Sequence, residues 1–117
     1  MNVRSLFIGM ALVGMCSAAS AEDASKPMKI WNLTAATIVD FRLAPSGSVK
    51  FGHNLVLDDK DKEISIDERL TLRAIAPGVY DAHVKFSNGR RCTVAGIKLD
   101  AGTIASIEEK DLRSCLR

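Results

Sequence analysis

Apolar and polar residues alternate with a period of two along much of the chain. The clearest stretch holds Tyr80, Ala82, Val84 and Phe86 on one parity and Asp81, His83, Lys85 and Ser87 on the other. This alternation predicts a strand with one face turned toward a core. The Asn88-Gly89 pair that follows predicts a hairpin with a type I′ turn, because both central positions of that turn take positive φ.

The strand that returns from this hairpin changes parity. Cys92 and Val94 share one face, whereas Ile97 and Leu99 share the other. The change falls at Gly96, which predicts a β-bulge there. We expect a last strand over residues 103–107 and one helical turn over residues 108–112.

Shorter alternating runs precede the hairpin. Trp31 and Leu33 share a parity, and extended segments are expected over residues 39–43, 49–57, 64–66 and 70–72, with Phe51, Leu55 and Leu57 on one side of the second. Turn residues separate these runs, and no stripe of helical period is sustained. About six to eight short strands predict an all-β fold, a small antiparallel β-sandwich. The alternative is a small α+β domain in which residues 58–72 are helical.

Residues 1–21 have the layout of a secretory signal peptide. Arg4 precedes the apolar run 6–15, and Ala19-Ser20-Ala21 supplies a small-x-small cleavage site. The run is about half of the roughly 20 residues that span a bilayer, so no membrane span is expected. We therefore expect export with cleavage after Ala21, a flexible lead-in over residues 22–28 and a single domain over residues 29–117.

The cysteines agree with export. Cys16 lies inside the signal peptide, and Met15 before it argues against lipidation. Cys92 and Cys115 remain, which predicts a disulfide in an oxidising compartment. The bridge would close a loop of about 24 residues and stabilise the fold by roughly 3 kcal/mol.

The charge balance excludes some partners. Without residues 1–21 the chain keeps 15 basic and 14 acidic side chains. Nucleic acids and anionic membrane surfaces select a strong basic excess, so neither is an expected partner.

Few residues suggest metal chemistry. The two histidines, His53 and His83, could form a copper site with Met28, because imidazole and thioether ligands suit Cu(I). The acidic loop Asp58–Glu63 fails the calcium-loop pattern, since Ile64 and Leu70 stand where glycine and glutamate are needed. No metal or other cofactor is therefore expected, and copper binding is the alternative function.

Catalytic patterns are also missing from the sequence. It holds no Gly-x-Ser-x-Gly, glycine-rich phosphate loop or His-Glu-x-x-His motif. A carboxylate pair such as Asp40 and Asp81 occurs in any small protein. A hydrolase would need His83, an acid and a hydroxyl gathered in one pocket. We expect the protein not to be an enzyme.

One local basic cluster is a candidate partner-contact patch. It consists of Lys85, Arg90, Arg91 and Lys98, which solubility and protection of a strand edge also explain. The polar residues Asn32, Thr34 and Asn54 stand among apolar ones, and we expect them to satisfy backbone groups at strand ends.

Several short motifs resemble one group of proteins. They are Ile30-x-Asn32-x-Thr34, Phe51-Gly52-x-Asn54-Leu55, Pro77-Gly78-x-Tyr80-Asp81, Phe86-x-Asn88-Gly89-Arg90-x-Cys92 and Leu112-x-x-Cys115. Together they resemble small exported proteins of Gram-negative bacteria, mostly of unknown function. The chain departs from that group at Phe51, where tryptophan is common, and in having no cysteine just before Tyr80. The resemblance implies a periplasmic β-sandwich and carries no activity.

The function expected from these observations is a non-enzymatic module. It would bind or support an envelope protein or a peptide, because sandwiches make such contacts through edge strands and end loops.

Overall fold

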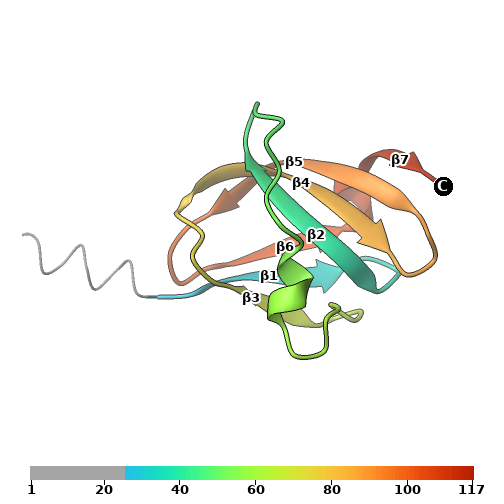
Figure 1. Ribbon diagram of the computed structural model, residues 1–117, viewed down its shortest axis with the longest axis horizontal. Helices are drawn as coiled ribbons and strands as arrows, with labels where there is room; N and C mark the ends of the chain where they lie inside the picture. Colours follow the sequence, from blue (N-terminus) through green and yellow to red (C-terminus); the bar gives the residue numbers. More distant parts are fainter. Residues whose placement is uncertain (1–25) are drawn as a thin grey trace, which may run out of the picture.

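Two sheets packed face to face form the structure (Figure 1), a computed structural model that describes residues 26–117. One sheet has the order β3 (Arg69–Leu72), β1 (Met28–Leu33), β6 (Ile104–Glu108). The other has the order β2 (Ile38–Pro45), β4 (Gly78–Phe86), β5 (Arg91–Leu99), β7 (Arg113–Leu116). Two short 3-10 helices, η2 (Leu55–Asp58) and η3 (Glu109–Asp111), join the strands. The expected signal peptide and residues 22–25 of the lead-in lie outside the described residues.

The predicted all-β sandwich with one disulfide is confirmed. The sulfur atoms of Cys92 and Cys115 are bonded, and the strand number falls inside the expected range. No helix within residues 26–117 has the length and apolar content needed to cross a membrane.

Alternation predicts the core correctly in β4, where Ala82, Val84 and Phe86 are buried between the sheets. In β1 the buried residues are Met28, Ile30 and Asn32, so the inward parity is opposite to that of Trp31 and Leu33. The strand also begins at Met28, which the sequence assigned to the lead-in.

Trp31 lies outside the core because its indole has partners near the surface. Its Nε1 donates to the carboxylate of Asp67 over 3.0 Å, and the guanidinium of Arg69 lies 4.3 Å from the centroid of the ring. These contacts tie the loop before β3 to β1, which gives the large aromatic side chain a structural role.

One strand pair departs from the antiparallel pattern. β1 and β6 run parallel, with Ile30 opposite Ala105 and Asn32 opposite Ile107. The chain changes sheets in the turn after β5, so β6 enters the first sheet by a crossover instead of a hairpin. Parallel pairing requires such a crossover. The strand expected to be last is followed by β7, which the sequence did not predict.

The segment between β2 and β3 is less regular than expected. Residues 49–54 form no strand, Leu55 and Val56 are buried in η2, and Leu57 is exposed. Residues 59–68 form turns with one isolated bridge from Ile64 to Ile38, so the helical alternative for residues 58–72 is wrong.

Asn54 explains this arrangement and confirms its expected backbone role. Its Oδ1 accepts from the N–H of Val56 over 3.2 Å and from the N–H of Phe41 over 2.9 Å, while its Nδ2 donates to the carbonyl of Val39. The side chain therefore caps η2 and satisfies the free edge of β2 at once.

The hairpin between β4 and β5 forms, with a different turn from the predicted one. Gly89 has a φ of 91°, whereas the φ of Asn88 is not positive. The N–H of Gly89 donates to the carbonyl of Phe86, and the N–H of Phe86 donates to the carbonyl of Arg90. This is a three-residue loop in which a type I turn is followed by a left-handed glycine.

The predicted bulge is present at Gly96, and Asp81 holds it. Tyr80 pairs with Ile97 and Ala82 with Val94, so two residues of β5 oppose Asp81. One oxygen of the Asp81 carboxylate accepts from the N–H of Gly96 over 3.1 Å, and the other accepts from the N–H of Gly47 over 3.2 Å. The carboxylate thus connects the bulge to the turn that ends β2.

These bonds lower the pKa of Asp81, chiefly through Gly96 and then Gly47. Because the folded pKa is below the unfolded value of about 3.9, the bonds stabilise the fold fully above that pH and are lost as the pH falls through the folded pKa. We expect Asp81→Asn to lower the melting temperature at pH 7 and to flatten its decline between about pH 5 and 2.5. Circular dichroism melts at several pH values test this. Equal acid sensitivity in the variant and the wild type would contradict the assignment.

Candidate functional site

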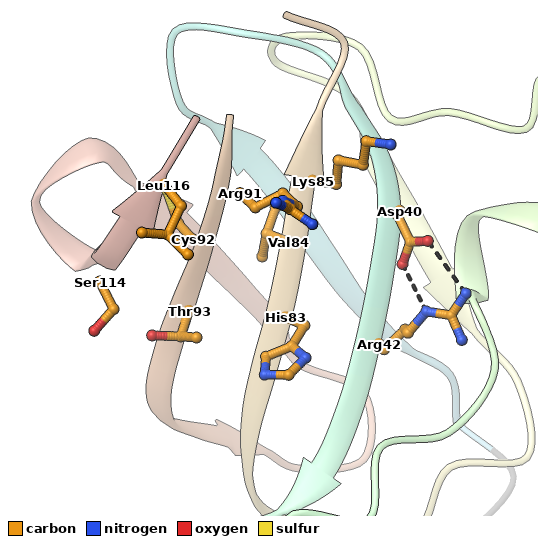
Figure 2. A pocket seen from close by; sticks show the side chains of 10 residues that line it. All are labelled: Asp40, Arg42, His83, Val84, Lys85, Arg91, Cys92, Thr93, Ser114 and Leu116. Atoms are coloured by element: carbon orange, nitrogen blue, oxygen red, sulfur yellow. Dashed lines mark hydrogen bonds and ion pairs between the residues drawn. The ribbon is translucent and has the colours of Figure 1, made fainter. Parts of the chain in front are cut away.

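A shallow groove lies on the outer face of the sheet β2-β4-β5-β7. Strand register sets two rows of side chains across this face: Asp40, Lys85, Arg91 and Leu116 in one, and Arg42, His83 and Thr93 in the other. With Ser114 these residues line a groove of about 430 Å³ (Figure 2). The lining comes from all four strands, so the sandwich fold assembles it from distant parts of the chain.

Asp40 and Arg42 form the β2 side of the groove. Nε and Nη2 of Arg42 donate to the two carboxylate oxygens of Asp40 over 2.9 and 3.2 Å, as the dashed lines in Figure 2 mark. The hydrogen bond to Asp40, followed by its negative charge, raises the pKa of Arg42. Asp40 is therefore ion-paired with Arg42, although Lys85 is the residue directly opposite it on β4.

Two cations in the middle of the groove face each other across strands. Lys85 of β4 is directly opposite Arg91 of β5, and both are exposed. Among the described residues neither makes an ion pair. Like charges directly opposite on a sheet repel and destabilise it. An anion placed between these two side chains would remove that repulsion.

His83 borders the same two cations along β4. Its imidazole stacks on the ring of Phe51, with centroids 3.6 Å apart and planes inclined by 17°. Phe51 belongs to the irregular segment after β2, which crosses this side of the sheet. The stack fixes the imidazole at the groove and leaves its nitrogens free of hydrogen bonds to other described residues.

The residues of the copper hypothesis are not brought together. Met28 is buried in the core, whereas His83 lies on the outer face of the opposite sheet. His53 is exposed, and its Nε2 lies 3.1 Å from the carboxylate of Asp58. The β2-β4-β5-β7 sheet therefore lies between the thioether of Met28 and the imidazole of His83, so the two cannot bind one metal ion.

The predicted basic patch is divided by the fold. Only Lys85 and Arg91 share the groove. Arg90 turns away, and its Nη1 lies 3.1 Å from the carboxylate of Glu109. Lys98 pairs with Val79 at the far end of β5, roughly 20 Å along the strand from Arg91.

The groove also gathers the residue types that a hydrolase would need, without connecting them. The hydroxyl of Thr93 donates to the carbonyl of Arg113, and Asp40 is held by Arg42. Within the described chain, no hydrogen bond joins His83 to the carboxylate of Asp40 or to the hydroxyl of Thr93. The groove therefore places these residue types on one face without the hydrogen bond between nucleophile and base that links them in a hydrolase. Asp81 lies four register rows from Asp40, so the two carboxylates do not pair.

Three carboxylates of the acidic loop do approach each other. Oxygens of Asp59, Asp61 and Glu68 lie within 4.8 Å. Two of the three accept backbone hydrogen bonds, because the N–H of Asp61 donates to the carboxylate of Asp59 and the N–H of Ser65 donates to the carboxylate of Glu68. These two carboxylates therefore stabilise turns of the loop.

Comparison of the chain with protein-family models, with curated proteins and with solved structures finds no match. The chemistry of the groove is therefore the basis for the proposed function. Sequence reasoning placed His83 and Lys85 outward but overlooked Asp40 and Arg42 as groove residues. Their spacing of two on β2, set against the register with β4, is the signal that could have found them.

Proposed function

We propose that this protein is an exported, non-enzymatic binding module that contacts an acidic segment of another envelope protein or peptide. The groove on the outer face of the β2-β4-β5-β7 sheet is the contact surface. The observation that carries the proposal is the cross-strand pair of Lys85 and Arg91, two exposed cations without an acidic partner among residues 26–117.

Charge at the groove favours an anionic partner over a neutral one. Arg42, Lys85 and Arg91 supply three positive charges against the single negative charge of Asp40. Residues 26–117 hold 15 basic and 12 acidic side chains, and without the four groove residues the remainder holds 12 basic and 11 acidic ones, which is close to balance. The excess on this face therefore distinguishes it from the rest of the surface.

The shape of the groove favours an extended partner. It is open and crosses four strands, so a short stretch of chain can lie along it with alternate side chains turned toward the sheet. Carboxylates on every second residue of such a segment would meet the cations. The layout of residues 1–21 and the disulfide support the exported location.

A fluorescence polarisation titration tests the proposal. The probe is a labelled nine-residue peptide in which Glu alternates with Thr, and the reference peptide carries Gln in place of every Glu. We expect the Glu peptide to bind with a dissociation constant on the order of 100 μM at low salt and to weaken steadily as salt is added. The Gln peptide should not bind measurably.

Charge reversal localises the contact. Lys85→Glu/Arg91→Glu should weaken binding of the Glu peptide by at least about tenfold. The control Lys98→Glu/Lys110→Glu makes the same change in net charge at exposed lysines outside the groove, and should weaken binding by no more than about twofold. Equal losses in the two double variants, or no binding by the wild type, would overturn the proposal.

A further inference from the structure

The strand β7 is attached to the sandwich by few contacts. All four of its residues are exposed, and Leu116 is 65 % exposed. Leu112, just before it, is the last buried side chain of the described chain. β7 pairs with β5 at two positions, Arg91 with Leu116 and Thr93 with Arg113. Apolar burial therefore contributes almost nothing to holding this strand in place.

The disulfide supplies the attachment that burial does not. Cys115 lies within β7, and its partner Cys92 is a buried residue of β5 with only 4 % of its surface exposed. Two cross-strand pairs at a sheet edge return less free energy than ordering a five-residue terminus consumes. The strand therefore depends on the bond between the two sulfur atoms.

β7 also forms one wall of the groove. Ser114 and Leu116 line it on the side opposite Asp40 and Arg42, as Figure 2 shows. Leu116 stands directly beside Arg91 in register. Loss of β7 would remove this wall and free the side chain of Arg91 from its neighbour.

We infer that β7 is a disulfide-held latch, and that thiol–disulfide exchange at Cys115 releases it and weakens binding of the acidic segment. The inference rests on the proposed function for its effect on binding, whereas release of the strand stands on the geometry alone. Burial directs the exchange, because Cys115 is exposed to an attacking thiolate and Cys92 is shielded.

The reductant is a dithiol of the Cys-x-x-Cys class. Its thiolate attacks Sγ of Cys115, the bond between Cys115 and Cys92 breaks, and Cys92 leaves as a thiolate that takes a proton from water. The second thiolate of the reductant then attacks the mixed disulfide and releases Cys115. Two electrons pass to the cysteine pair, and the reductant becomes a disulfide. The chain 113–117 is then free.

Hydrogen–deuterium exchange on the full chain tests release without any ligand. Oxidised protein is compared with dithiothreitol-reduced protein and with Cys92→Ala/Cys115→Ala at about 15 °C. We expect protection at Arg91 and Thr93, the β5 residues paired with β7, to fall at least about tenfold further than protection at the amides of β1, β2 and β4, which reports only the loss of global stability. An equal loss of protection in all strands, with no additional loss at these two residues, would overturn the latch.

The Glu peptide then tests the consequence for the groove. We expect it to bind reduced protein and Cys92→Ala/Cys115→Ala about threefold or more weakly than oxidised protein. Equal affinity for the oxidised and reduced forms would show that β7 has no effect on the groove. The two proposals fail separately, because absence of binding to oxidised protein contradicts the proposed function and leaves the exchange result intact.

Discussion

Replacing Asn32 with leucine is expected to destabilise the domain by about 3–5 kcal/mol. Asn32 is fully buried, and its Nδ2 donates to the carbonyls of Ala36 and Ile64, each over 2.9 Å. Its Oδ1 accepts from the N–H and the hydroxyl of Thr34 over 3.0 and 2.6 Å. One side chain thus joins the corner after β1 to the loop before β3. Leucine would leave several of these buried groups without partners.

Urea unfolding followed by the fluorescence of Trp31 measures this loss. Thr34→Val is the graded control, since it removes one hydroxyl from the same network and should cost about 1 kcal/mol. Because small domains have only about 5–15 kcal/mol of stability, the leucine variant should be partly unfolded at 37 °C. An Asn32→Leu protein as stable as Thr34→Val would contradict the assigned role.

Removing the disulfide is expected to have the second largest effect. Cys92 and Cys115 are 23 positions apart, and a loop of this length restricts the unfolded chain by about 3 kcal/mol. For a domain of this size the loss corresponds to a fall in melting temperature of roughly 10–20 °C. No side chain of β7 belongs to the described core, so the two sheets should still form at low temperature without the disulfide.

Thermal melts of oxidised protein, reduced protein and Cys92→Ala/Cys115→Ala provide the measurement. The reduced protein and the double variant should melt at nearly the same temperature, well below the oxidised protein. A melting temperature within about 3 °C of the oxidised form would show that the bridge contributes little to the fold.

Strands that cross the middle of a sheet are predicted well by alternation. β4 is the clearest example, because its inward residues pack on the other sheet and its outward residues meet water. The bulge at Gly96 follows from the same rule, since a change of parity requires an extra residue. The disulfide follows from the two cysteines that remain when residues 1–21 are interpreted as a signal peptide.

Elements whose position depends on distant partners are not predicted. β7 has no buried residue, so no alternation marks it, and Cys115 fixes where it pairs. The parallel pair of β1 and β6 joins segments about 70 residues apart, which no local pattern reveals. In residues 49–57 the apolar spacing predicted an extended segment, but Asn54 caps the 3-10 helix η2 there instead.

The groove shows the same division. Local pattern places His83 and Lys85 on an outer face and groups Arg91 with Lys85, whereas only the strand register adds Arg42 from β2. Sequence proximity also suggested Arg90 and Lys98, which the fold places outside the groove. Arg90 is next to Arg91 in the chain but pairs with Glu109, whose pKa is lowered first by the N–H of Ala35 and then by Arg90.

The most direct test of the binding groove maps the contact on the folded protein. Heteronuclear NMR spectra are recorded while the Glu peptide is added to ¹⁵N-labelled oxidised protein. The proposed groove predicts that the shifting amides cluster at Arg42, His83, Lys85, Arg91 and Thr93, and that the outer face of β1 and β3 stays unchanged. Shifts centred on another surface, or spread evenly over all exposed lysines and arginines, would contradict it.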